Sequence, residues 1–225
     1  MSVRGVFVTG TDTGVGKTFA SCALLAALRA RGLRAVGMKP VASGCRATAA
    51  GLRNEDAEAL IAASAPAPAY ADCNPFAFAE PIAPHIAARD SGIEIGLEPI
   101  RAAHAHLVRD ADVIVVEGVG GWMAPLSDTL MQADLARALE LSVVLVVGLR
   151  LGCLNHALLS ARAIAADGCV LAGWIANRVD PAMARADANL ATLRARIAAP
   201  LLGVLDHTPG CAPEQVANAL DAAAL

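Results

Sequence analysis

A glycine-rich segment near the N-terminus has the residue types and the spacing of a phosphate-binding loop. Residues 10–18 read Gly-Thr-Asp-Thr-Gly-Val-Gly-Lys-Thr, which fits the pattern G-x-x-x-x-G-K-[ST]. In such a loop the backbone N–H groups surround the phosphates of a nucleotide, Lys17 reaches the β- and γ-phosphates, and the Thr18 hydroxyl binds Mg²⁺. The other loop residues expected to contact the phosphates are Thr13, Gly14, Val15 and Gly16. The segment therefore predicts a site for a nucleoside triphosphate, with Mg²⁺ as its cofactor.

The elements around this loop support the prediction. The loop follows the apolar run 6–8 and precedes the alanine- and leucine-rich stretch 18–31, so a strand leads into it and a helix follows. A helix N-terminus presents free N–H groups and the positive end of the helix dipole to an anion. A glycine-rich turn before an ordinary helix is the alternative, and the order of strand, loop and helix favours the phosphate loop.

A lysine and an acid follow two further apolar runs. Lys39 begins the sequence Lys-Pro-Val-Ala-Ser-Gly, where it could neutralise phosphate or carboxylate charge while the turn presents Ser43. A solvated lysine before a proline turn explains the same residues equally well. Glu117 ends a buried run, where an acid can hold Mg²⁺ directly or through water. The residues that follow it are Gly118, Val119 and Gly120, and the glycines permit close approach of the backbone to a ligand.

Three more polar residues have both a functional and a structural explanation. Asp56 lies in the first turn of a predicted helix, where the helix dipole alone favours an acid. Asn155 is a natural N-cap, and the free N–H groups near it would make a second anion site, suited to a carboxylate. Asn177, followed by Arg178, could hydrogen-bond a purine edge or simply turn the chain.

Strand-like and helix-like runs alternate along the chain. The predicted strands are 5–9, 35–39, 113–117, 143–147, 171–176 and 201–205. The predicted helices are 17–31, 54–63, 98–109, 130–139, 155–166, 181–197 and 213–224. Runs 113–116 and 143–147 are continuously apolar, as in strands that are buried on both faces of a parallel sheet. The pattern predicts one α/β domain over residues 1–225, a doubly wound, mostly parallel sheet flanked by helices, with ligands at the carboxyl ends of its strands.

The stretch 65–96 is rich in proline and has no clear period. It could be a linker between two domains, but no second core with its own character follows it. We expect a long loop over the active edge of the sheet, because loops of this length in compact domains are usually functional.

Composition and charge disfavour several classes of protein. The net charge is −3 and no block of like charges indicates nucleic acid or an anionic membrane as a partner. The longest apolar run, 141–149, is too short to span a bilayer, and the N-terminus leads directly into a strand without a signal peptide. The six cysteines include no C-x-x-C pair, and His104 and His106 fit a solvated helix face better than a metal site. These features predict a cytoplasmic protein with reduced thiols.

Taken together, the motifs resemble those of the dethiobiotin synthetase family, ATP-dependent ligases of biotin synthesis. The matching segments are 8–18, 39–44, 51–57, 78–81, 84–85, 116–122, 125–128, 151–156 and 172–174. The resemblance as a whole runs in order from residue 3 to about residue 205, and only the last twenty residues match poorly. Many ATPases share the phosphate loop alone, whereas the whole set is highly specific.

The resemblance implies a reaction. 7,8-Diaminononanoate takes up CO₂ as a carbamate, whose oxygen attacks the γ-phosphate of ATP to give a carbamic–phosphoric anhydride. The second amine then closes the ring of dethiobiotin and expels phosphate. Lys17 and Lys39 are implied to stabilise charge on the transferring phosphoryl group. Thr18, Asp56 and Glu117 are implied to bind Mg²⁺.

The resemblance also implies how the substrates are held. Thr13 and Ser43 would contact the diamine carbamate. Cys153, Leu154 and Asn155 of the neighbouring subunit of a homodimer would hold its carboxylate end. The residues implied around the nucleotide base are Asn177, Arg178, Asp206, His207 and Thr208.

Two positions depart from the family pattern. Gly14 stands where some relatives have an acidic residue, so any side-chain role there is absent. The segment 206–209 reads Asp-His-Thr-Pro instead of a version with proline and tryptophan, which puts its adenine contacts in question, although backbone contacts could survive the change.

Two other classes of protein use a similar loop. One is another ATP-dependent ligase that activates or amidates a carboxylate. The other is a nucleotide-switched partitioning or metal-insertion ATPase, in which ATP drives dimerisation. Partitioning ATPases usually carry an extra lysine where this chain has Thr11, and metal-insertion ATPases need a cysteine pair, so both switch interpretations are disfavoured.

Overall fold

A six-stranded parallel sheet forms the centre of this computed structural model, which describes residues 4–206 and 210–225. The strand order is β10-β9-β8-β1-β7-β2, and every neighbouring pair is parallel. The strands are β1 (Arg4–Gly10), β2 (Ala35–Met38), β7 (Val113–Gly121), β8 (Ser142–Gly148), β9 (Leu171–Asn177) and β10 (Leu201–Leu205). All six predicted strands are therefore confirmed, as is the doubly wound α/β class.

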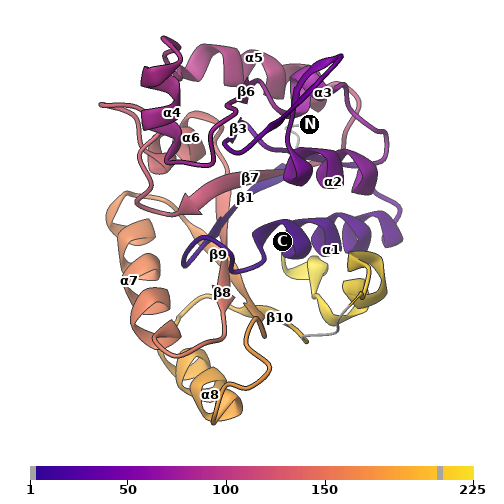
Figure 1. Cartoon of the computed structure of the whole chain (residues 1–225). Coiled ribbons are helices and arrows are strands. Elements are labelled where there is room, and N and C mark those ends of the chain that lie inside the picture. The colour runs from indigo at the N-terminus through magenta and orange to yellow at the C-terminus, as the bar shows by residue number, and fades with distance from the viewer. Residues whose placement is uncertain (1–3, 207–209) are drawn as a thin grey trace.

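Helices cover both faces of the sheet (Figure 1). Side chains of β1 alternate between the two resulting cores: Phe7 enters one, and Val6 and Val8 enter the other. One core includes α1 (Lys17–Ala30), α2 (Glu55–Ala63) and the 3₁₀ turn η1 (Pro213–Ala219). The other includes α4 (Pro84–Asp90), α5 (Leu97–Val108), α6 (Gln132–Ala138), α7 (Cys153–Ala166) and α8 (Ala186–Arg196). Within the described ranges no helix is long and apolar enough to cross a membrane.

Two predicted helices are wrong in part. The helix expected over 181–197 begins only at Ala186, because Asp180 accepts a hydrogen bond from the Ala182 N–H and Arg185 has a left-handed φ of 58°. The stretch expected as a helix over 213–224 forms the 3₁₀ turns η1 and η2 (Ala222–Ala224). Between these two turns the backbone hydrogen-bonds to the edge strand β10, because the Asp221 N–H donates to the Leu202 carbonyl at 2.7 Å.

The stretch 65–96 is not the structureless loop that its composition predicts. It contains α3 (Tyr70–Cys73), β6 (Phe76–Ala77) and α4, and β6 pairs in parallel with β3 (Val41–Ala42). A short hairpin of β4 (Arg46–Thr48) and β5 (Gly51–Arg53) was also not predicted. Figure 1 shows α3, β3, β6 and α4 grouped with α5 beside one end of the sheet. We call α3, β3, β6 and α4, with the connections between them, the extension; it is tied to the residue after β2, because the Lys39 N–H donates to the Cys73 carbonyl at 2.8 Å.

Burial of β7 predicts a large effect on stability. Ile114 is fully buried in β7, so Ile114→Ala should lower the free energy of unfolding by about 2–5 kcal/mol through the cavity it leaves. The same truncation at Ile93, which is 46% exposed, should cost less than about 1 kcal/mol. Urea unfolding of both variants measures the difference. Equal losses would contradict the assignment of Ile114 to the core.

Candidate active site

The phosphate loop connects β1 to α1 and is fastened to the neighbouring strands. Gly14 and Gly16 have φ values of 72° and 81°, which side chains other than glycine rarely adopt. The Asn177 Nδ2 at the end of β9 donates to the Val15 carbonyl at 2.9 Å. A Cβ atom added at Gly16 would lie 2.1 Å from the same nitrogen, so the loop rests directly on the Asn177 side chain.

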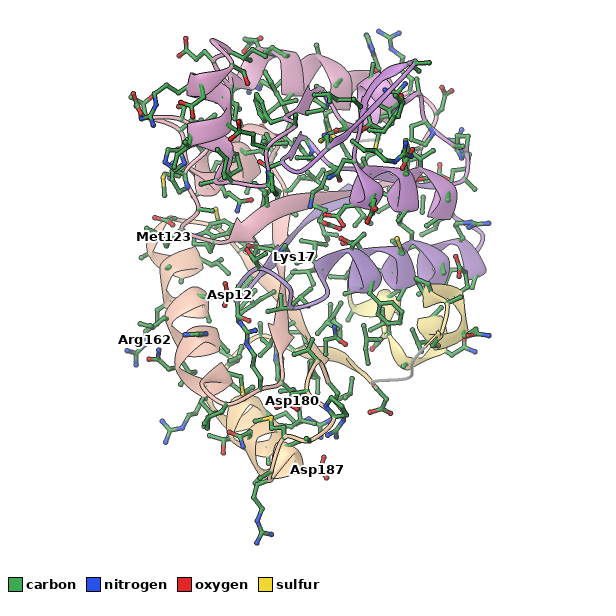
Figure 2. The ribbon with its side chains drawn as sticks, viewed as in Figure 1. Asp12, Lys17, Met123, Arg162, Asp180 and Asp187 are labelled. Carbon is green, nitrogen blue, oxygen red and sulfur yellow. The ribbon has the colours of Figure 1, made fainter. Side chains whose placement is uncertain are left out.

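An ion pair holds the tip of the loop from the other side. Asp12 pairs with Arg150, which follows β8, and its carboxylate also accepts the Thr13 N–H at 2.8 Å. The Lys17 Nζ donates to the Asp12 carbonyl at 2.9 Å (Figure 2). Burial, followed by the nearby charge of Lys39, lowers the pKa of Lys17 to about 8. The loop thus carries a buried ammonium where phosphate charge would arrive.

A second charged cluster lies beside the loop. The Lys39 Nζ donates to the Glu117 Oε1 at 2.6 Å and lies 3.1 Å from the Asp56 Oδ2. The Thr18 hydroxyl donates to the same Glu117 Oε1 at 2.9 Å. The side chains of Lys39 and Glu117 are 4% and 0% exposed. Side chains from α1, α2, β7 and the residue that follows β2 therefore meet at one point.

Each charge in this cluster depends on its partners. Burial favours neutral Lys39, but the charges of Glu117 and Asp56 outweigh it and hold the lysine pKa above its ordinary value. Burial likewise opposes the charge on Asp56, and Lys39 outweighs it, so the pKa of this carboxyl lies below its ordinary value. The cluster stays charged because its members are paired, as buried ions must be.

One cavity of about 860 Å³ contains most of the residues that the sequence predicts for the site. Those lining it are Thr13, Gly14, Gly16, Lys17, Thr18, Lys39, Ser43, Asp56, Glu117, Val119 and Gly120. Residues 81–84 of the extension also line it, so this part of the predicted loop does border the site. A second cavity of about 910 Å³ lies near Gly5 and Val113, at the amino ends of the strands, away from these residues.

Two predicted residues lie beside the cavity in supporting positions. Val15 is buried under the loop, and the Gly118 carbonyl accepts a hydrogen bond from the Lys39 Nζ at 3.1 Å. The structure therefore brings the predicted phosphate and metal residues together, although they come from four separate parts of the sequence.

The predicted carboxylate-binding segment is not part of this cavity. Within the described residues, none of Cys153, Leu154 and Asn155 lines it. The prediction of Asn155 as an N-cap is wrong, because Gly152, with a φ of 95°, is the N-cap and α7 begins at Cys153. Glycine at that position lets the chain turn into the helix before Asn155.

The predicted base-binding residues have partners within the chain. Arg178 forms ion pairs with Asp206 at 2.9 Å and with Asp187 at 2.6 Å. Asp187 lies in the first turn of α8, and Figure 2 shows it at the far end of the molecule from α5. His207 and Thr208 lie outside the described residues.

The two histidines expected on a solvated helix face differ from each other. His106 is exposed, and its Nδ1 lies 3.0 Å from the Asp72 Oδ1. His104 is half-buried, and burial lowers the pKa of its imidazole. Its Nε2 has no hydrogen-bond partner among the described residues, so the expected solvation is wrong for His104.

Two residues that support the site were not predicted. Gln132 is 1% exposed, accepts the Val119 N–H at 3.1 Å and donates to the Gly121 carbonyl at 2.7 Å, which fixes the glycine-rich end of β7. No spacing in the sequence indicates this contact. Asn54 caps α2 by accepting the Ala57 N–H at 3.2 Å, and an asparagine before two acids is a signal that could have found it.

The residues present fit a hard cation such as Mg²⁺. The Glu117 Oε2 is buried and has no hydrogen-bond partner among the described residues, so it is an open anionic oxygen. Thr18 and Asp56 supply further oxygen atoms next to it, the donor type that Mg²⁺ prefers. Among the described residues no three or more His, Cys, Asp or Glu side chains are grouped so that they alone could hold a metal ion, so water or phosphate oxygens would complete the coordination.

The sheet order and the phosphate loop define a P-loop nucleoside triphosphatase fold. The chain matches the AAA domain family over residues 4–215. Similar solved structures include the signal recognition particle receptor FtsY of Elizabethkingia anophelis with GDP (TM-score 0.53, 17% identity, 91% of this chain and 57% of that chain). Another is the MinC:MinD cell division complex of Aquifex aeolicus (TM-score 0.57, 14% identity, 92% of this chain and 82% of that chain). Identities this low establish the fold alone.

Curated relatives identify a narrower family. The ATP-dependent dethiobiotin synthetase of Xanthomonas euvesicatoria is 63% identical over 204 residues, which cover 91% of each chain. The synthetase of the same name from Xylella fastidiosa Temecula1 is 58% identical over 221 residues and 98% of each chain. The chain belongs to the ATP-dependent dethiobiotin synthetase family of ligases.

The lowered pKa of Lys17 predicts that nucleotide binding depends on pH. Phosphate charge favours the protonated lysine, so binding raises its pKa and takes up a proton when the pH exceeds about 8. Affinity for a non-hydrolysable ATP analogue should be constant below this pH and fall by up to about tenfold per unit above it. Calorimetry in two buffers of different ionisation enthalpy measures both affinity and proton uptake.

The matched variant for this measurement is Lys17→Arg, whose guanidinium stays charged throughout the range. It should bind more weakly and show a flat profile above pH 8. If nucleotide affinity declines equally in both proteins above pH 8, the proton is taken up by a group other than Lys17.

Proposed function

We propose that this chain is a cytoplasmic, homodimeric dethiobiotin synthetase that joins 7,8-diaminononanoate and CO₂ with the consumption of ATP. The observation that carries the proposal is the Lys39–Glu117–Asp56 cluster beside the phosphate loop, in which Lys39 and Glu117 are buried and which shares one cavity with Ser43. The names of the relatives support the overall reaction. The cluster supports the phosphoryl-transfer chemistry that this reaction needs.

In the proposed reaction one amine of the diamine adds to CO₂ and loses a proton, which gives a carbamate. A carbamate oxygen displaces ADP from the γ-phosphorus, forming a carbamic–phosphoric anhydride. The second amine attacks the carbamoyl carbon, the bond to phosphate breaks, and the ring of dethiobiotin closes. No atom changes its oxidation state in these steps, so the reaction needs no oxidant or reductant.

The residues of the cavity would act on charge and position. Lys17 and the loop N–H groups bind the phosphates, and Lys39 stabilises the charge that develops on the transferring group. The Ser43 hydroxyl is buried and has no hydrogen-bond partner among the described residues, so it is available to the carbamate together with Thr13. Thr18, Asp56 and Glu117 would hold Mg²⁺, which supplies charge neutralisation for the phosphates when it is bound.

The direct test is phosphate release coupled to a colorimetric assay, with the diamine, bicarbonate, Mg²⁺ and ATP. Turnover that depends on the diamine, with dethiobiotin identified by mass spectrometry, supports the proposal. ATP hydrolysis that does not depend on the diamine would indicate a nucleotide-switched ATPase instead.

The proposed metal site predicts a specific effect of one carboxylate. Asp56→Asn keeps the shape of the side chain but removes its charge, so the half-saturating Mg²⁺ concentration should rise on the order of tenfold. Excess Mg²⁺ should restore part of the activity. Steady-state rates across a Mg²⁺ titration measure the change.

The control is Glu55→Gln, which neutralises the exposed acid next to it in the first turn of α2. This variant loses the same favourable contact with the helix dipole but should keep the wild-type Mg²⁺ dependence. If both variants behave like wild type, Asp56 is an ordinary first-turn acid.

The proposed homodimer explains two features of the surface. Around α7 lie the exposed apolar side chains of Met123, Leu151 and Leu159, which are 63%, 96% and 56% exposed. Contact with a second copy would cover such side chains. The N-terminus of α7 lies outside the cavity of its own chain, so the carboxylate end of the diamine would meet Cys153, Leu154 and Asn155 of the second copy.

A composite site predicts recovery of activity in mixed dimers. Lys17→Ala and Asn155→Ala would damage opposite halves of each site, so a mixed dimer holds one intact site and one doubly damaged site. Purified through two different tags, it should regain about half of the wild-type rate, although each parent is impaired. A mixed dimer no more active than its parents would place Asn155 outside the partner's site.

A further inference from the structure

The main chain around Lys39 is held by a segment of the extension. The Lys39 N–H donates to the Cys73 carbonyl at 2.8 Å, and the Lys39 carbonyl accepts the Asn74 Nδ2 at 2.7 Å. The Phe76 N–H donates to the carbonyl of Pro40 at 3.1 Å. Both backbone groups of Lys39 are therefore fixed by residues 73–74, and the direction in which its side chain leaves β2 depends on them.

A single hydroxyl connects this segment to the start of α2. The Tyr70 hydroxyl donates to the Asn74 Oδ1 at 3.0 Å and accepts the Asn54 N–H at 2.7 Å. Asn74 and Asn54 are 4% and 7% exposed, so water does not readily replace either bond. Asn54 is the N-cap of α2, and Asp56 lies two residues after it.

We propose that Tyr70 is a positioning residue, whose hydroxyl holds the Lys39 ammonium and the Asp56 carboxylate in register for phosphoryl transfer. The inference rests on the proposed function for the roles of those two groups. Asp56 belongs to α2 and Lys39 directly follows β2, yet the two charged groups lie 3.1 Å apart. The path through Asn74 to Lys39 and the path through Asn54 to Asp56 meet at one oxygen atom.

The chemistry of the hydroxyl suits this task. It has one proton to donate and lone pairs to accept with, so one group can serve Asn74 and Asn54 at once. Burial raises the pKa of Tyr70 above its ordinary value, so the proton remains available at neutral pH. The Arg53 guanidinium lies 4.1 Å from the ring centroid and covers the ring. Without the hydroxyl, a buried N–H and a buried carbonyl each lose a partner.

The test is Tyr70→Phe, which keeps the ring and removes only the oxygen. We expect kcat to fall about tenfold, because small errors of position are costly in catalysis. The half-saturating Mg²⁺ concentration should rise about threefold or more as Asp56 shifts. The KM for ATP should change by less than about twofold, because the phosphate loop is untouched.

The control removes a different hydroxyl that also joins β2 to α2. Ser64 accepts the Gly37 N–H of β2 at 2.9 Å and donates to the Leu60 carbonyl at 2.6 Å, near the C-terminal end of α2. Ser64→Ala should lower the thermal midpoint while kcat and the Mg²⁺ dependence stay at wild-type values. If Tyr70 has only a structural role, Tyr70→Phe should behave like Ser64→Ala, with a lower thermal midpoint and unchanged kcat and Mg²⁺ dependence.

A double variant tests whether Tyr70 acts through Asp56. If it does, Tyr70→Phe combined with Asp56→Asn should need no more Mg²⁺ than Asp56→Asn alone, because coupled residues are not additive. The inference is overturned if the two Mg²⁺ shifts simply add. It is also overturned if Tyr70→Phe keeps kcat and Mg²⁺ dependence within about twofold of wild type.

A binding measurement separates this inference from the proposed function. Mn²⁺ affinity in the presence of a non-hydrolysable ATP analogue, followed by electron paramagnetic resonance, needs no knowledge of the second substrate. If wild type lacks diamine-dependent turnover, the proposed function fails, and weaker Mn²⁺ binding by Tyr70→Phe still supports the positioning role. If wild type turns over and Tyr70→Phe binds Mn²⁺ and reacts like it, only the positioning role fails.

Discussion

Lys39 and Glu117 are almost completely removed from water, and each is tolerable there only because the other lies 2.6 Å away. This requirement organises the surrounding elements. β7 must run between β1 and β2 so that Glu117 ends beside both the phosphate loop and Lys39. α2 must begin close enough for Asp56 to share the lysine. Residues 81–84 of the extension line another part of the cavity, and residues 73–74 bind both main-chain groups of Lys39.

The parts of the site that the sequence predicts are those set by local pattern and by the geometry of parallel strands. The phosphate loop is encoded in nine consecutive residues, and Lys39 and Glu117 come at the ends of apolar runs that a parallel sheet must place side by side. Asp56 could not be distinguished from a first-turn acid, because the contact that distinguishes it is with Lys39, seventeen positions earlier in the chain.

The parts that the sequence does not predict depend on contacts between distant residues. β3 and β6 have two residues each and α3 has four, too few for any hydrophobic period. Side chains such as Asn74, which bond to the backbone of other segments, stabilise them. The start of α7 was misplaced for another reason: Asn155 is a good capping residue by type, but the positive φ of Gly152 begins the helix earlier.

The contact between Gly16 and Asn177 limits how this chain can change over evolutionary time. Any side chain at position 16 meets the Asn177 amide, so the glycine cannot be replaced while that asparagine remains. A smaller residue at position 177 would make room, but it would leave the Val15 carbonyl without its donor. The left-handed φ of 81° at position 16 would also still disfavour any side chain there. The two sites, 161 places apart in the sequence, are therefore expected to stay invariant together as the chain evolves.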